Sequence, residues 1–280
     1  MIRALAAAAA LALAPAPALA AGDVAAPPPA GSVASPPQDV SRIESCVRRN
    51  LPERSSRQAV RFRAVDRLGS ARVSQAEILW HRFAGGPRAL VRFLAPDELE
   101  GSALLLVQSE DRADIFLYLP ELEGVRRVTG RKVAGALFGT DFSYEDVERL
   151  LGLYAEGGSR RLPDAEVDGR EAWVLESRPS RGGESQYARV VSYVDRRTCV
   201  PLRIDLFERD DRLRKVLKVP RQRVERRGTG WLPTLVLMKD LVETTYTELI
   251  VDDVILDVEL SHKLFEEREL AHSARRKGGP

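Results

Sequence analysis

The segment GTDFSYEDVERLL, residues 139–151, holds the side chains in this sequence that most resemble a reactive site. Three carboxylates, two hydroxyls and a phenol fall within seven residues: Asp141, Glu145, Asp146, Thr140, Ser143 and Tyr144. Asp141 together with Glu145 or Asp146 could act as a general acid and base on a glycosidic or similar bond. An envelope hydrolase that uses the Asp141–Asp146 cluster is therefore one function to consider.

The same residues are also typical of a helix start. Ser143 and Asp146 have the spacing of an N-cap and its N3 partner, and the helix dipole favours Glu145 and Asp146 in the first turn. These features account for three of the polar side chains without catalysis. Residues this close on one helix start seldom face each other across a substrate, so we favour the helix over an active site. We expect no catalytic residues and no enzyme activity.

Positive charge just upstream offers a structural role for the remaining carboxylates. Arg126 and Arg127 could pair with Asp141 and Glu145. The expected result is an ion-paired latch that holds the helical segment against the rest of the domain.

Motifs for other chemistry are absent from the sequence. Gly130–Gly135 has the outer spacing of a phosphate loop but lacks the Lys and Ser/Thr that must follow. No G-x-S-x-G sequence occurs. The three histidines, His81, His262 and His272, have no ligand-type spacing. We therefore expect no metal and no cofactor.

The N-terminus predicts export. One arginine precedes a run of Ala and Leu that ends at prolines and at Ala18-Leu19-Ala20, the pattern of a cleaved signal peptide over residues 1–20. Residues 21–40 form a Pro/Ala-rich linker. One domain is expected over residues 41–270, followed by a basic tail over 271–280.

Charge argues against one class of partner. The chain has 43 Lys+Arg and 41 Asp+Glu, a formal net charge of +2, and both signs alternate in short runs. A nucleic-acid-binding protein normally carries a strongly basic face. We therefore expect no nucleic acid.

Two cysteines, Cys46 and Cys199, allow one pairing. Because an exported chain meets an oxidising environment, we predict a disulfide between them.

Most of the chain reads as short strands with alternating polar and apolar residues. The strands are expected at about 60–68, 73–83, 88–94, 103–109, 115–119, 187–194, 201–208, 213–219, 221–226, 232–238 and 244–251, with an Asp-Gly hairpin turn at 168–169. An antiparallel meander of this size must curl or close because strand twist accumulates. The few expected helices, at 41–50, around 133–137, at 143–153 and near 264–270, are enough to cover one face.

Four sequence segments together resemble a known family. They are Tyr118-Leu119-Pro120, Arg126-Arg127-Val128, the stretch from Phe138 to Asp146 and Val200-Pro201-Leu202. In combination, from about Ser41 to Leu270, they look like the bacterial outer-membrane lipoprotein-sorting protein family, the group similar to the periplasmic carrier LolA.

The resemblance implies a mainly β fold: a curved, incomplete antiparallel β-barrel with a few capping helices over an apolar cavity. It also implies a periplasmic location, lipid or acylated lipoprotein as cargo and transient contact with membranes. An inner-membrane transporter of the resistance-nodulation-division type is a further partner by analogy with some relatives.

A carrier needs apolar side chains on the concave face of its sheet. The candidates on strands are Phe62, Trp80, Leu90, Phe93, Leu117, Leu119, Trp173 and Tyr193. The candidates on the covering segment are Leu137, Phe138 and Phe142. Ordinary core packing is the alternative for each, and a one-residue error in strand phase would exchange the inward set for its neighbours.

The sequence leaves three functions open. The first is a periplasmic carrier that moves lipid or lipoprotein acyl chains between envelope membranes. The second is a non-enzymatic envelope protein whose barrel binds a protein partner, and the third is the hydrolase considered above.

Overall fold

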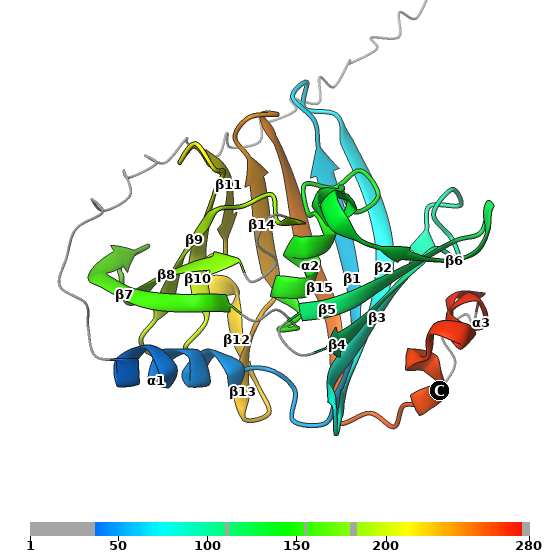
Figure 1. Ribbon diagram of the computed structural model, residues 1–280, viewed down its shortest axis with the longest axis horizontal. Coiled ribbons are helices and arrows are strands. Elements are labelled where there is room, and N and C mark those ends of the chain that lie inside the picture. Colours follow the sequence, from blue (N-terminus) through cyan, green and yellow to red (C-terminus); the bar gives the residue numbers. More distant parts are fainter. Residues whose placement is uncertain (1–36, 110–111, 154–155, 180–183, 276–280) are drawn as a thin grey trace, which may run out of the picture. The chain divides into compact units, whose positions relative to one another are not determined.

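A single antiparallel sheet of thirteen strands makes up most of the protein, as the computed structural model in Figure 1 shows. The structure describes residues 37–109, 112–153, 156–179 and 184–275, all within one compact unit, Ser32–Pro280. The strand order is β6-β5-β4-β3-β2-β1-β15-β14-β11-β10-β9-β8-β7. The sheet is curved and does not close, so β6 and β7 form its two edges. The expected mainly β, incomplete barrel is confirmed.

The strands of one half of the sheet come from the first part of the chain. They are β1 (Ser55–Val65), β2 (Ala71–Phe83), β3 (Gly86–Ala95), β4 (Ala103–Ser109), β5 (Arg112–Leu119) and β6 (Leu122–Val128). The strands of the other half are β7 (Glu156–Val167), β8 (Arg170–Pro179), β9 (Arg189–Asp195), β10 (Pro201–Phe207), β11 (Leu213–Lys218), β14 (Leu235–Asp240) and β15 (Thr245–Leu256). Because β15 pairs with β1, the last strand joins the two halves.

A separate two-stranded sheet lies outside this order. It is the hairpin of β12 (Val224–Arg227) and β13 (Gly230–Pro233), preceded by a short 3-10 helix, η3 (Arg221–Arg223). The sequence predicted one continuous strand over 221–226 and another over 232–238. The structure divides each of these segments, because the chain leaves the large sheet after β11 and re-enters it at β14.

Alternation along the strands separates two faces. On β1, Val60 and Phe62 point to the face that carries the largest hydrophobic cluster. Arg61 and Arg63 point the other way and pair with carboxylates of β15, at 2.6 Å for Arg61–Asp252. We call the apolar side the inner face and the opposite side the outer face. The inner face must be covered, because its side chains gain stability only when they leave water.

Local turn chemistry is as the sequence predicts at the β7–β8 hairpin. Asp168 and Gly169 both have positive φ, 50° and 74°, the combination of a type I′ turn. The strand β6, which the sequence did not indicate, pairs with β5 at the sheet edge.

Three α-helices are described. They are α1 (Pro37–Arg48), α2 (Tyr144–Leu150) and α3 (Leu270–Arg275). Shorter 3-10 segments are η1 (Gly130–Ala134), η4 (His262–Phe265) and η5 (Glu267–Glu269). Helix α1 begins four residues before the expected Ser41, and the segment expected around 133–137 is the 3-10 turn η1.

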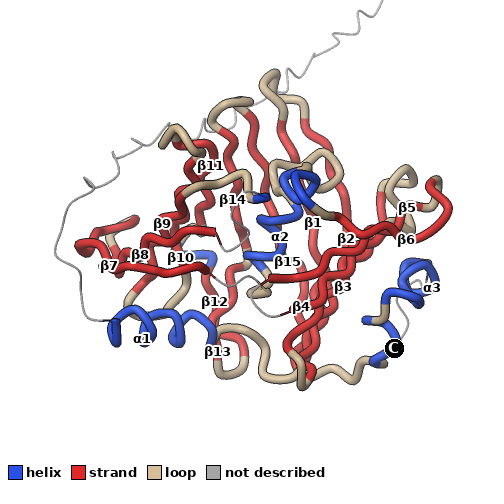
Figure 2. The backbone as a smooth tube through the Cα atoms, viewed as in Figure 1, coloured by secondary structure: helices blue, strands red, loops and turns tan. Residues whose placement is uncertain are grey.

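The helices lie on different sides of the sheet, as Figure 2 shows. Helix α2 covers the inner face, whereas α3 and η4 pack on the outer face of β3 to β5, where Leu270 and Phe265 are fully buried. Helix α1 packs near β7 to β9. Within the described residues, no helix combines the length and the apolar character needed to cross a membrane. The predicted signal peptide, most of the predicted linker and residues 276–280 of the predicted tail lie outside the described residues.

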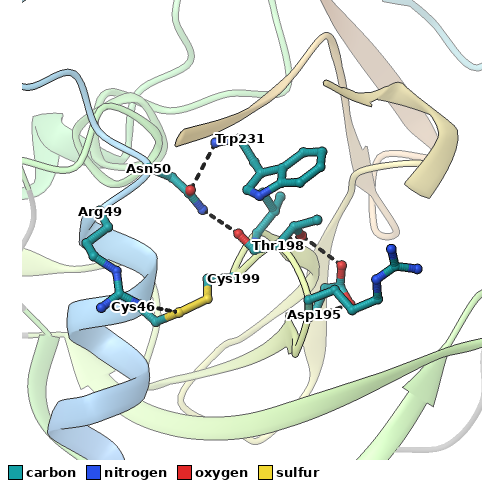
Figure 3. The surroundings of a disulfide bond; sticks show 9 residues. Cys46, Arg49, Asn50, Asp195, Thr198, Cys199 and Trp231 are labelled. Atoms are coloured by element: carbon teal, nitrogen blue, oxygen red, sulfur yellow. Dashed lines mark hydrogen bonds between the residues drawn. A yellow bond between two sulfur atoms is a disulfide. The ribbon is translucent and has the colours of Figure 1, made fainter. Parts of the chain in front are cut away.

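The predicted disulfide is confirmed: Cys46 on α1 bonds to Cys199 in the turn between β9 and β10. The two cysteines are 153 residues apart in the chain. Figure 3 shows how the bond fixes α1 to this turn. A cross-link between positions so distant restricts the unfolded chain strongly.

Replacement of both cysteines, Cys46→Ser with Cys199→Ser, is expected to lower the free energy of unfolding by about 2–5 kcal/mol, because the loop constraint on the unfolded chain is lost. Urea denaturation of the oxidised protein and the variant measures this difference. Reduction of the parent protein with a thiol should give the same loss. An unchanged denaturation midpoint in both experiments would contradict a stabilising bond.

Candidate functional site

The inner face encloses a cavity of about 540 Å³. It lies between the sheet on one side and α1, the end of α2 and the β12–β13 hairpin on the other. This size is within the range of roughly 300–1,000 Å³ that is usual for small-molecule sites. The arrangement leaves a partly open space with a mainly apolar wall.

Inward-pointing residues of several strands form the wall. Ile78 and Trp80 come from β2, and Leu206, Leu217, Met238 and Leu249 come from β10, β11, β14 and β15. Each is almost fully buried apart from its contact with the cavity. The sequence places them there by simple alternation, since the intervening residues point to the outer face.

The end of α2 forms a second boundary of the cavity. The indole Nε1–H of Trp80 donates to the carbonyl oxygen of Leu151, at 3.1 Å. Gly152 follows with φ of +70°, and a Cβ there would lie 2.6 Å from Leu51. Glycine is therefore required at this position, because the turn is left-handed and Leu51 packs directly on the backbone.

The Asn50 side chain joins three segments beside the cavity: the exit of α1, the turn between β9 and β10, and the β12–β13 hairpin. The Asn50 Nδ2–H donates to the carbonyl oxygen of Thr198 at 2.9 Å, and the backbone N–H of Trp231 donates to Asn50 Oδ1 at 3.0 Å. Figure 3 shows both bonds beside the disulfide. The hydroxyl of Thr229 also donates to Glu53, at 3.0 Å. The β12–β13 hairpin is thus held against the exit of α1 by a few hydrogen bonds.

A second part of the inner face is filled by aromatic side chains instead of a cavity. Phe62 stacks on Phe93 with ring centroids 6.0 Å apart and meets Phe142 edge-on at the same distance. Phe138 contacts Phe93 edge-on at 4.6 Å. The covering segment Leu137–Phe142 therefore packs as core above β1 and β3. We call this group the phenylalanine cluster.

The structure distributes the sequence candidates over several places. Trp80 lines the cavity. Six other candidates lie in the inner-face core outside the cavity wall: Phe62, Phe93, Leu117, Leu137, Phe138 and Phe142. Trp173 packs against α1 beside the disulfide, and Leu119 lies half-buried at the end of β5. Leu90 and Tyr193 lie on the outer face, in clusters with Phe265 and with Phe207. The sequence phase was wrong by one residue at these two positions.

A buried ion pair fixes the start of α2. Lys215 Nζ lies 3.1 Å from the Asp146 carboxylate and also donates to the carbonyl oxygen of Asp141, at 2.7 Å. The Tyr187 hydroxyl donates to the same carboxylate at 2.9 Å. Asp146 also accepts from the backbone N–H of Ser143, whose hydroxyl accepts from the Asp146 N–H. The predicted capping box at Ser143 is present, and its carboxylate serves tertiary structure as well.

The surroundings shift the pKa values of the ionisable groups in this cluster in different directions. Burial alone would raise the pKa of Asp146, but the Lys215 ammonium and the hydrogen bonds from Ser143 lower it below its ordinary value. Burial raises the pKa of Glu145, and Arg149 and Ser185 oppose this effect only in part. Burial and the neighbouring Asp146 carboxylate raise the pKa of Tyr187 well above its ordinary value. The Asp146 carboxylate is therefore ionised at neutral pH.

The latch expected from Arg126 and Arg127 has different partners. Arg127 pairs with Asp114 on the neighbouring strand, and Arg126 is exposed on β6. Asp141 accepts hydrogen bonds from the hydroxyls of Thr245 and Thr247 on β15. Glu145 accepts from Ser185 at 2.6 Å and lies 3.9 Å from Arg149. The expectation was wrong because Arg127 and both carboxylates have other partners.

Lys215 and Tyr187 are the important residues that sequence reasoning missed. A usable signal for Lys215 was its strand phase, because it alternates with Leu217 and Val219, which both face inward. A lysine on the inner phase of a strand needs a buried acid. Among the described residues, no group of three or more His, Cys, Asp or Glu is placed to hold a metal ion.

Comparison with solved structures identifies the fold. A DUF1329 family protein from Desulfovibrio piger is 24% identical, with a TM-score of 0.75 over 82% of this chain and 96% of that one. A putative outer membrane lipoprotein-sorting protein domain from Vibrio parahaemolyticus is 21% identical, with a TM-score of 0.72 over 82% and 97%. A LolA superfamily protein from Nitrosomonas europaea is 17% identical, with a TM-score of 0.64 over 85% and 99%.

A model of a DUF1329-like family, described as that of an uncharacterized protein, matches residues 85–272, more than half of the chain. The chain belongs to this family. Its structural neighbours are LolA superfamily and lipoprotein-sorting proteins, so the resemblance seen in the sequence is confirmed. No curated protein matches the chain.

In this DUF1329-like protein, Lys215→Met is expected to lower the free energy of unfolding at pH 7 by about 3–5 kcal/mol, because the Asp146 carboxylate stays buried without its cation. Denaturant unfolding measures the loss. The matched control is Arg212→Met, which removes an exposed cation paired with Glu208 and should leave the curve unchanged.

The free energy of unfolding should also depend on pH differently in the parent protein and in the Lys215→Met variant. In the parent protein the lowered pKa of Asp146 gives stability that is present above the unfolded value of about 3.9 and is lost as the pH falls through the folded value. Without Lys215 the folded pKa rises, so the deficit of the variant should shrink as the pH falls from 7 to 5. A deficit that is constant over this range would argue against the ion pair as its cause.

Proposed function

We propose that the protein is a periplasmic carrier that binds lipid or lipoprotein acyl chains in the inner-face cavity and moves them between envelope membranes. The observation that carries the proposal is the 540 Å³ cavity itself, walled by Ile78, Leu206 and similar side chains inside a LolA-like sheet. An apolar chain leaves water on entering such a space, which favours binding by about 25 cal/mol per Å² of buried apolar surface.

The predicted signal peptide and the confirmed disulfide support export to the periplasm, because disulfides persist in oxidising compartments. On this proposal, residues 1–20 are removed and the 41–270 domain is the working carrier. Membranes are then transient partners, and an inner-membrane transporter of the resistance-nodulation-division type is the proposed donor or acceptor.

A non-enzymatic role fits the carboxylates of the 139–151 segment. Asp141 accepts hydrogen bonds from the hydroxyls of Thr245 and Thr247. Glu145 accepts one from the hydroxyl of Ser185, and Asp146 forms an ion pair with Lys215. Each of the three therefore has a structural partner in the covering segment. We propose that they hold this segment and do not act on a substrate.

Cavity content is the direct test. The mature protein, purified from a periplasmic fraction without detergent, should show a defined excess mass in native mass spectrometry and release lipid or acylated peptide on extraction. Val236→Trp should reduce this occupancy strongly, because Val236 lines the cavity and the larger ring fills it. Leu217→Phe is a milder second variant at the same wall.

Val73→Trp is the control, since Val73 is 46% exposed and lies away from the cavity wall. Overpacking costs about 1–3 kcal/mol, so each variant is compared at equal folded content by circular dichroism. A bare polypeptide mass for the parent protein would favour the protein-partner function instead. Equal occupancy in all folded variants would remove the cavity from the proposal.

Asp141→Asn separates the carrier from a hydrolase. The amide accepts the two threonine hydrogen bonds less well than the carboxylate, so the variant should lose about 1–2 kcal/mol of stability, or a few °C in Tm, with unchanged cargo content. An envelope hydrolase would show the opposite pattern. Its Tm would stay the same, while hydrolysis of added glycan or ester substrates would disappear.

A further inference from the structure

The β12–β13 hairpin and the η3 turn before it form a strongly basic arm at the boundary of the cavity. Arg221, Arg223, Arg226 and Arg227 lie on it, with Glu225 as the one acid between Pro220 and Pro233. This stretch therefore carries a charge of +3, whereas the whole chain carries +2. We call it the arginine arm.

The cations of the arginine arm point to solvent. All four arginines are exposed. Arg227 pairs with Glu225, at 2.6 Å, but within the described part of the chain no ion pair or hydrogen bond involves the guanidinium group of Arg221, Arg223 or Arg226. Some exposed arginines elsewhere on the sheet, such as Arg61, are paired with carboxylates. The arm gathers three unpaired guanidinium groups on one short stretch of chain.

The arm is also part of the cavity wall. Arg227, Thr229 and Trp231 line the cavity, and the exit of α1 lines it from the facing side with Arg48 and Leu51. Figure 1 shows α1 and the hairpin side by side at one end of the sheet. Trp231 is half-buried, with an apolar ring and a polar N–H, the kind of side chain that is enriched at membrane surfaces.

We propose that the arginine arm docks the protein on a membrane rich in anionic lipid headgroups, with the cavity boundary facing the bilayer. Basic residues next to a membrane gain attraction from its negative surface potential, and the effect extends over about one Debye length, about 8 Å at physiological ionic strength. Docking in this orientation lets an acyl chain pass between bilayer and cavity with little contact with water.

This inference rests on the proposed carrier function, but it can fail separately. The test is flotation of the full mature protein with vesicles of pure phosphatidylcholine and vesicles containing phosphatidylglycerol. The parent protein should float with the anionic vesicles and not with the neutral ones, and high salt should weaken binding. Arg223→Glu with Arg226→Glu should weaken it by about tenfold or more.

The matched control is Arg131→Glu with Lys132→Glu, which reverses two exposed cations of η1 away from the cavity wall. This control changes the net charge by the same amount and should retain binding. Equal loss in both double variants, or equal binding of the parent protein to neutral vesicles, would overturn the proposal. Binding of the arm to an acidic protein in place of vesicles would overturn it as well.

Cavity content, measured on the same preparations by lipid extraction, separates the two proposals. Cargo in the parent protein without vesicle binding means that the docking surface is wrong and the carrier stands. Vesicle binding that depends on Arg223 and Arg226 without any cargo means that the arm docks and the carrier function is wrong.

Discussion

The carboxylate of Asp146 is the group on which the covering of the inner face depends. It completes the capping box at Ser143 and accepts from Lys215 on β11 and Tyr187 ahead of β9. A single charged group therefore starts a helix and fixes that helix to β11 and to the segment before β9. The interaction is strong because water is excluded, and for the same reason every partner must be present.

With α2 fixed, the inner face divides into two regions. Over β1 and β3, Phe62, Phe93, Phe138 and Phe142 fill the space. Where α1 and the hairpin stand apart from the sheet, a cavity remains, walled by residues of β2, β8–β11, β14 and β15.

The cavity persists because its boundaries cannot easily collapse. The disulfide fixes α1, and the buried ion pair fixes α2. Collapse would have to break these links before the apolar walls could meet, so the cost of empty space in the core is offset by a rigid frame.

The sequence predicted those features that depend on neighbouring residues. The Ser143 capping box, the Asp168-Gly169 turn and most strands follow from local patterns. The disulfide could be predicted because the sequence contains only two cysteines. The partner of Asp146 was different, because Lys215 lies 69 residues away and nothing local connects them. The face of Leu90 was missed for a related reason: most of β3 is buried on both sides, so alternation there carries little signal.

The two boundaries of the cavity are unequal in strength, and this decides where it can open. Displacing α2 would break the Asp146–Lys215 pair, and loss of one partner of a buried pair costs about 3–5 kcal/mol. Displacing the hairpin would break the Trp231–Asn50 and Thr229–Glu53 hydrogen bonds, worth about 0.5–1.5 kcal/mol each. Segments held by a few partly exposed hydrogen bonds open first. The less costly opening therefore lies at the hairpin, beside Arg226 and Arg227, and the same element that closes the cavity carries the charge that can bring it to an anionic surface.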